Sequence, residues 1–153
     1  MFLGISLLIL GCLTIAATPG GNRTIRAKEF ILEDANGKNR ASLNMLENLP
    51  RLCLTDENGD IRAAFAMTKA GSTLVSRDER GELRAMLLVT RKGPVLNLRD
   101  ANGNPCVMLG ADKDGSGMLL YDGDGKRRFM LATREQVMLG MFDVNGKPIW
   151  RAP

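Results

Sequence analysis

The sequence predicts an all-β fold made of repeated β-hairpins. Three observations support this prediction: a motif that recurs at a fixed period, a glycine that ends each copy of it, and apolar residues that alternate on both sides. The motif is Asp-x-x-Gly, and its aspartates lie 22, 22, 22, 22 and 21 residues apart. A period of this size is typical of stacked copies of one small unit.

Each motif is expected to form the turn of a hairpin. An aspartate can accept a hydrogen bond from its own backbone two residues on, and glycine adopts positive φ without a Cβ clash. A type I turn followed by a left-handed glycine is a common hairpin connection with a bulge. We therefore expect positive φ at the last residue of each of the six turns, which are Asp34 to Gly37, Asp56 to Gly59, Asp78 to Gly81, Asp100 to Gly103, Asp122 to Gly125 and Asp143 to Gly146.

Apolar residues two positions apart flank each turn, which is the period of a half-buried strand. Before the turns the pairs are Phe30/Leu32, Leu52/Leu54, Leu96/Leu98, Met118/Leu120 and Leu139/Met141, while the third copy has Leu74 and Ser76. After the turns they are Ala41/Leu43, Ala63/Phe65, Ala85/Leu87, Val107/Leu109 and Phe129/Leu131. These columns predict about twelve short strands around a narrow core.

We favour an antiparallel meander of hairpins that curls into a closed or prism-like body. The alternative is a β-solenoid, in which each copy forms one coil and like strands pair in parallel. The sixth copy is one residue short and carries Trp150 where copies one to three have alanine. We expect Trp150 to be largely buried, either as a cap on an open stack or docked near Phe30 in a closed body.

The amino-terminal segment predicts a membrane attachment. Residues 1–18 are assigned to a transmembrane anchor or signal-like helix, 19–23 to a linker and 24–153 to the β-hairpin repeat domain. Residues 2–17 carry no charge, and as a helix they would be about 24 Å long, slightly short for a bilayer core. The alternatives are a cleaved secretory signal, which lacks the usual basic start, and a lipoprotein signal that uses Cys12.

The membrane side stays open on sequence alone. We expect a membrane-anchored chain whose repeat domain is extracytoplasmic, on the periplasmic side. Arg23, Arg26 and Lys28 follow the apolar run, and the positive-inside rule would place that end in the cytoplasm.

Composition argues against most catalytic chemistry. The 153 residues include no histidine, which removes the usual acid–base group and many metal ligands. Cys53 and Cys106 lack metal-ligand spacing. Calcium is suggested by carboxylates at Asp112, Asp114, Asp122 and Asp124, but no closing glutamate follows and turn chemistry explains them. We therefore expect no enzyme activity, no catalytic residues, no cofactor and no metal.

Two columns are candidate interaction sites. Arg40, Arg62, Arg84 and Arg128 each lie six residues after a turn aspartate. We expect an outward stripe, which pairs with nearby Glu33, Asp60 and Glu82 or meets anionic ligands. Met86, Met108 and Met130 lie eight residues after the aspartate, with a parity opposite to the core columns. They are expected to form an exposed ridge, which usually marks an interface.

The repeat pattern resembles a known group of sequences. Leu-x-Leu-x-Asp-x-x-Gly-x-x-Arg-Ala-x-Leu, after an apolar start and before the ending Trp150-Arg-Ala-Pro153, is similar to bacterial membrane-anchored or exported β-repeat proteins. The resemblance covers residues 24–153 and implies the hairpin-repeat fold, but no assigned activity. The chain departs from the pattern at Ser76, Asn104-Pro105-Cys106 and Lys147-Pro148-Ile149.

These features predict a non-enzymatic, membrane-anchored accessory subunit. Its repeat domain would be a protein-interaction scaffold in a larger membrane complex, such as a respiratory, photosynthetic or transport assembly. The expected partners are other protein subunits and, through residues 2–17, the membrane, while a homo-oligomer stays open. Nucleic acid is not expected, because only 5% of residues are aromatic. The alternative is an exported module that binds an anionic glycan or lipid through the arginine column.

Overall fold

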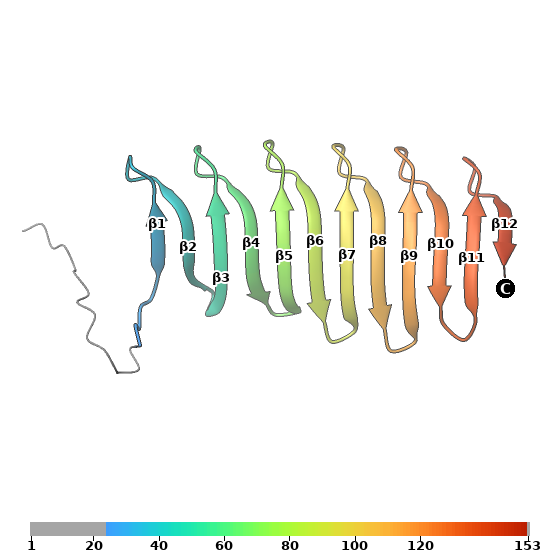
Figure 1. Cartoon of the computed structure of the whole chain (residues 1–153), viewed down its shortest axis with the longest axis horizontal. Helices are drawn as coiled ribbons and strands as arrows, with labels where there is room; N and C mark the ends of the chain where they lie inside the picture. Colours follow the sequence, from blue (N-terminus) through green and yellow to red (C-terminus); the bar gives the residue numbers. More distant parts are fainter. Residues whose placement is uncertain (1–23, 153) are drawn as a thin grey trace, which may run out of the picture.

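A computed structural model describes residues 24–152, and this part of the chain forms one sheet of twelve strands (Figure 1). The order in the sheet is the order in the chain. The strands are β1 (Phe30–Glu33), β2 (Asn39–Leu46), β3 (Leu49–Thr55), β4 (Ile61–Thr68), β5 (Gly71–Arg77), β6 (Leu83–Thr90), β7 (Gly93–Arg99), β8 (Pro105–Asp112), β9 (Gly115–Tyr121), β10 (Arg127–Thr133), β11 (Val137–Phe142) and β12 (Pro148–Ala152).

The predicted all-β antiparallel meander is confirmed. Every neighbouring pair of strands is antiparallel, so the solenoid alternative is wrong. The expected closed or prism-like body is also wrong for the single chain, because β1 and β12 lie at opposite ends of an open sheet (Figure 1). The anchor expected at residues 1–18 lies outside the described residues. Within residues 24–152, no helix could cross a membrane.

The six Asp-x-x-Gly turns lie side by side at one end of the strands, along what we call the turn edge of the sheet, and they share one geometry. Their glycines have φ between 73° and 88°, which confirms the expected positive φ. In each turn the glycine N–H donates to the aspartate carbonyl, and the aspartate N–H donates to the carbonyl four residues on. In each hairpin the register also shifts next to the turn, because the strand that follows the turn holds one extra residue. An aspartate side chain and a left-handed glycine therefore position every second connection of the meander.

The connections at the other edge are shorter. Two residues join β4 to β5, β6 to β7, and β8 to β9. The glycine that starts β7, Gly93, has φ +131°, and a Cβ built on it would lie 1.8 Å from the carbonyl oxygen of Ala111 in β8. Only glycine fits such a close approach of two backbones. These tight hairpins keep consecutive repeats in register.

The apolar columns predicted as core lie together on one face of the sheet. Because the sheet is a single open layer, nothing in the described part of the chain covers that face. Many of its large side chains are exposed, and only two apolar residues of the described part are buried, Cys53 and Phe142, both on the other face. The expected interdigitated core is therefore absent from the single chain. Trp150 is 48% exposed, so its expected burial and its docking near Phe30 are wrong.

The sheet is unusually flat for its width. In Figure 1 the strands keep nearly the same direction from β1 to β12. Adjacent strands normally rotate by about 20 to 25°, and flat sheets of many strands are typically stabilised by stacking against another layer. The flatness leaves the apolar residues of all twelve strands in one straight strip.

Candidate interaction surfaces

The first candidate surface is the apolar face, which consists of two rows of side chains that cross all twelve strands. The row nearer the aspartate turns is Leu32, Ala41, Leu54, Ala63, Ser76, Ala85, Leu98, Val107, Leu120, Phe129, Met141 and Trp150. The second row is Phe30, Leu43, Leu52, Phe65, Leu74, Leu87, Leu96, Leu109, Met118, Leu131, Leu139 and Ala152. Neither row contains a charged residue.

The apolar face is exposed or half-buried along its whole length. Leu32 in β1 is 64% exposed, Phe65 in β4 is 54% exposed, and Leu109 in β8 is 39% exposed. Soluble monomers rarely expose a contiguous apolar patch beyond a few hundred Å². The strip continues from one edge strand to the other. Because its two rows contain no charged residue, it has the composition of the core of an interface.

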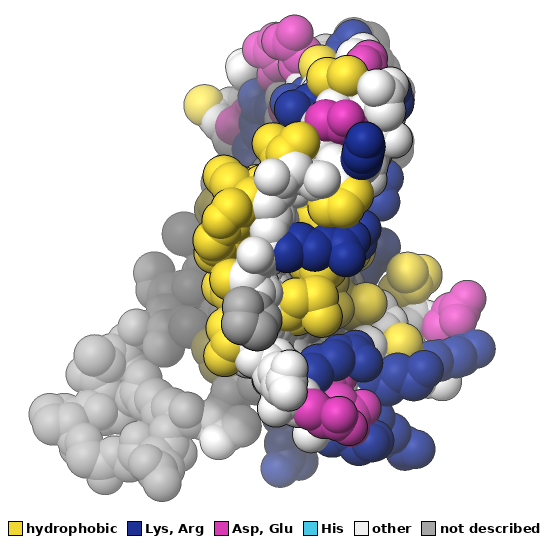
Figure 2. All heavy atoms as spheres, turned by 90° about the vertical axis from the view of Figure 1, so that its right-hand side faces the viewer, with side chains coloured by type: hydrophobic (Ala, Val, Ile, Leu, Met, Phe, Trp, Pro, Cys, Tyr) yellow, Lys and Arg dark blue, Asp and Glu magenta, His cyan; other side chains and the backbone are white. Residues whose placement is uncertain are grey.

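Charged side chains gather on the opposite face. Figure 2, a view along the sheet, shows hydrophobic side chains on its left and Lys and Arg side chains on its right. By register, Arg51, Arg99 and Arg151 lie on this second face. The guanidiniums of Arg127 and Arg151 lie 4.4 Å and 6.0 Å from the centre of the Phe142 ring, which explains why that ring is buried.

The methionine column lies on the charged face. Met86 and Met108 flank Asn97, and Met130 follows two strands further on, so the predicted opposite parity is confirmed. The three methionines are half-buried, however, and not the exposed ridge that was expected. A hollow of about 560 Å³ lies beside two of them. It is deepened by Gly110 and Gly117, which have no side chains. An interaction role for this column stays a prediction.

The arginine column lies on the turn edge and holds it together. Arg62 Nε donates to Asp56 Oδ2 at 2.7 Å, while its terminal nitrogens donate to the backbone carbonyls of Asp78 and Glu79 in the next hairpin. The guanidinium of Arg40 pairs with Asp34 at 2.8 Å.

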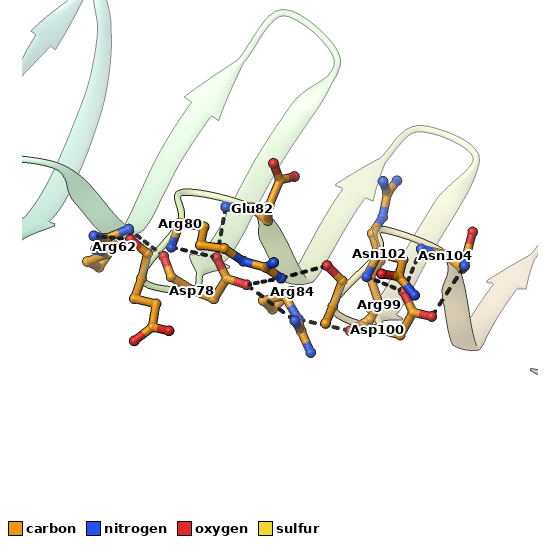
Figure 3. A network of polar contacts seen from close by, with 11 residues as sticks. Arg62, Asp78, Arg80, Glu82, Arg84, Arg99, Asp100, Asn102 and Asn104 are labelled. Atoms are coloured by element: carbon orange, nitrogen blue, oxygen red, sulfur yellow. Dashed lines mark hydrogen bonds and ion pairs between the residues drawn. The ribbon is translucent and has the colours of Figure 1, made fainter. Parts of the chain in front are cut away.

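Two further arginines repeat this bridge. Arg84 pairs with Asp78 at 3.2 Å and donates to the carbonyl of Arg99 (Figure 3). Arg128 pairs with Asp122 at 3.3 Å and donates to the carbonyl of Phe142. Arg62, Arg84 and Arg128 therefore fasten their hairpins to the following ones, where an outward stripe was expected. The pairing is with the turn aspartates and not with Glu33 or Glu82, although Asp60 lies 3.8 Å from Arg62.

The fourth hairpin has no arginine in this column, because Cys106 occupies the place. Asn104 performs the bridge there. Its Nδ2 lies 3.3 Å from Asp100 Oδ2 (Figure 3). The same nitrogen lies 3.3 Å from the carbonyl oxygen of Gly123 in the next turn. Sequence reasoning recorded Asn104 only as a departure from the repeat. The missing arginine beside a new amide was the signal that could have identified it.

Five of the six turn aspartates are stabilised in their charged form. In Asp34, one carboxylate oxygen accepts from the backbone N–H groups of Lys38 and Asn36, and the other accepts from Arg40. These bonds hold the pKa of Asp34 below its ordinary value, with the Lys38 N–H first, and they outweigh the opposing effect of burial. The pKa values of four more turn aspartates are also lowered, those of Asp56, Asp78, Asp100 and Asp122.

The structure separates the carboxylates considered for calcium. Asp112 and Asp114 lie at the connection between β8 and β9, whereas Asp122 and Asp124 follow the far end of β9. Within residues 24–152 there is no cluster of three or more His, Cys, Asp or Glu suited to a metal ion. The aspartates instead make turn hydrogen bonds, as Asp122 does with the N–H groups of Asp124 and Lys126.

A scan of protein-family models and a search of characterised proteins found no match to this chain. The class that its fold and surfaces define is therefore the structural one: an open antiparallel β-meander with an apolar face and a fastened turn edge.

Proposed function

We propose that this chain is a non-enzymatic structural subunit whose β-repeat domain is a protein-interaction scaffold in a membrane assembly. The observation that carries the proposal is the uncovered apolar face. Apolar side chains in water are unfavourable by about 25 cal/mol per Å², so a face that runs across twelve strands is strongly favoured to meet another surface.

The repeated geometry suits a scaffold. The hairpins are fastened to one another by arginine and asparagine bridges along the turn edge and by backbone pairing between all strands. A side chain on the apolar face therefore keeps its spacing from its neighbours, so that face offers a regular surface instead of a single pocket. Regular extended surfaces of this kind are how repeat proteins bind partners.

The membrane part of the proposal rests on the amino-terminal sequence. Residues 2–17 contain no charged residue, and an apolar run of this length can hold a domain at a bilayer. The scaffold would then work beside the membrane, on its periplasmic side, where other subunits of the assembly meet the apolar face.

The alternative function, binding of an anionic glycan or lipid through the arginine column, has less support. Arg40, Arg62, Arg84 and Arg128 already pair with turn aspartates at 2.5 to 3.3 Å. An anionic ligand would have to displace these carboxylates, and an ion pair exchanged for another gains little.

Ser76 provides a test of the scaffold function. It lies on the apolar face between Ala63 and Ala85, and its side chain is exposed, so an arginine there adds a charge without removing an apolar contact. We expect Ser76→Arg to release the full chain from a detergent-solubilised native assembly, measured by its migration on a native gel. The matched control is Thr73→Arg, on the same strand but on the opposite face.

The expected result is a loss of co-migration for Ser76→Arg and retention for Thr73→Arg. Recovery of the wild-type full chain as a free soluble monomer, with no associated protein, would contradict the proposed function.

A further inference from the structure

We infer that the apolar face is covered by the apolar face of a second copy of this chain, so that two sheets pack face to face. The inference rests on the proposed scaffold function and names the partner of its main surface. Three properties of the face support it: its size, its spacing and its charge.

The size of the face matches a stable interface between two copies. Twelve strands at about 4.8 Å make it about 53 Å long, and two rows of side chains make it about 14 Å wide, which is roughly 750 Å². One partner of a standard stable protein interface contributes about 800 Å². A second copy has a strip of the same length and width, so it would cover the face completely.

The spacing of the face favours a sheet as its partner. Side chains in both rows recur at the strand spacing of about 4.8 Å, and the side chains of a facing sheet recur at the same distance. A helix laid along the strip would recur every 5.4 Å and would lose register within a few strands. Small residues at Ala63, Ser76 and Ala85, between Leu54 and Leu98 in the same row, leave recesses that large side chains of a facing copy can enter.

The flatness of the sheet also favours a second copy as the partner. A free twelve-stranded sheet would be expected to twist or curl, whereas stacked sheets stay flat about 10 Å apart. Within residues 24–152 no second layer covers the sheet. A second copy supplies that layer without any other protein.

The charges select which face can self-associate. The chain has a net charge of +4, and arginines such as Arg51 and Arg99 lie on the opposite face. Two charged faces would repel each other. The two apolar rows contain no charged residue, so copies can approach through this face alone without placing like charges opposite one another.

The apolar amino-terminal segment of the same chain fits the face less well. Residues 2–17 would extend about 24 Å as a helix, which is less than half the length of the strip. A second copy is the occupant that matches the full length, and the amino-terminal segment stays free to attach to a membrane.

The test is the mass of the purified full chain in a mild non-ionic detergent, measured by light scattering. The protein concentration is varied from about 1 to about 100 µM, because weak dimers dissociate in the micromolar range. We expect twice the chain mass of 16.7 kDa for the wild type and for Thr73→Arg. Ser76→Arg should raise the dissociation constant by about 100-fold or more, because it buries an unpaired charge in the interface.

Circular dichroism of both variants checks that the β-sheet is retained, and the wild-type mass tests the inference without any substitution. A wild-type monomer at the highest concentration overturns the inference, and so does a dimer that Ser76→Arg leaves intact. If the purified chain is monomeric but Ser76→Arg still abolishes co-migration with the native assembly, the second copy is excluded while the scaffold function stands. If Ser76→Arg changes neither the mass in light scattering nor the co-migration on the native gel, both the inference and the proposed function are wrong.

Discussion

Arg62 pairs with Asp56 within one hairpin and also joins that hairpin to the next. The two side chains meet at 2.7 Å, and the same guanidinium donates to backbone carbonyls of the following turn. Each side chain is 21% exposed, so the pair is shielded from most of the solvent. Hydrogen bonds of charged groups in such positions contribute more than exposed ion pairs do.

We therefore expect Arg62→Ala to lower the free energy of unfolding by about 2 kcal/mol, since it removes charged hydrogen bonds to two hairpins. Urea titration monitored by circular dichroism measures this change. The control is Lys69→Ala, which removes an ion pair at 3.9 Å between side chains that are 88% and 73% exposed. An equal effect of both substitutions would show that the bridge does not stabilise the sheet.

The fourth hairpin allows the bridge to be exchanged. Asn104→Ala should lower the free energy of unfolding by about 1 kcal/mol, because it removes the link between the turns at Asp100 and Gly123. Cys106 occupies the place of the arginine column, so adding Cys106→Arg should restore most of that loss. A double-mutant cycle from urea titrations measures the coupling. Additive effects of the two substitutions would refute the equivalence of Asn104 and the arginines.

Stability should fall in acid through the turn aspartates. The folded pKa values of Asp34 and Asp122 are lowered, first by the backbone N–H of Lys38 and of Lys126 respectively, so the unfolded chain binds protons more readily. The stabilisation is complete above the unfolded pKa of about 3.9 and is lost as pH falls through the lower folded values.

Urea midpoints measured between pH 7 and pH 2.5 should be constant above about pH 5 and decline below about pH 4. Asp122→Asn should lower the midpoint at pH 7 and weaken its dependence on pH, whereas the exposed Asp124→Asn should leave both unchanged. A midpoint that stays constant down to pH 2.5 would exclude this role of the aspartates.

Alanine substitutions at three glycines distinguish the effect of backbone conformation on stability from the effect of a close contact. Gly59 has φ +88° with open space around its Cβ position, Gly93 has φ +131° and meets the carbonyl of Ala111, and Gly123 has open space. We expect alanine to destabilise by about 1 kcal/mol at Gly59 and by about 3 kcal/mol or more at Gly93, with almost no change at Gly123. Thermal unfolding of the three variants gives the order, and any other ranking would contradict the described turns.

Local rules were sufficient to predict the strands and their faces. The Asp-x-x-Gly motif fixes its own turn through hydrogen bonds within five residues, and the alternation of residues such as Leu52 and Leu54 fixes which side chains share a face. Both are short-range properties, so they can be read from a single copy of the repeat.

Closure of the sheet could not be predicted in this way. Apolar columns indicate that a face avoids water, but they do not show whether the same chain, a second copy or another protein covers it. Trp150 illustrates this limit: it lies on the apolar face at the last strand and is 48% exposed in the single chain. The arginine column was misjudged for a related reason. A bulge after each turn has residues such as Arg62 as its extra residue and directs them toward the aspartate, and strand parity alone does not include the bulge.

Methionine oxidation in the native assembly tests the central claim, that the apolar face is an interface, most directly. Met138 and Met141 lie on β11 and are each 45% exposed in the single chain, but Met141 is on the apolar face and Met138 is on the other. Brief treatment of native membranes with peroxide, followed by mass spectrometry, compares their rates of sulfoxide formation. If the face is covered, Met141 should react at least about fivefold more slowly than Met138, because oxidation follows exposure. Equal rates at the two methionines in the native assembly would contradict the account.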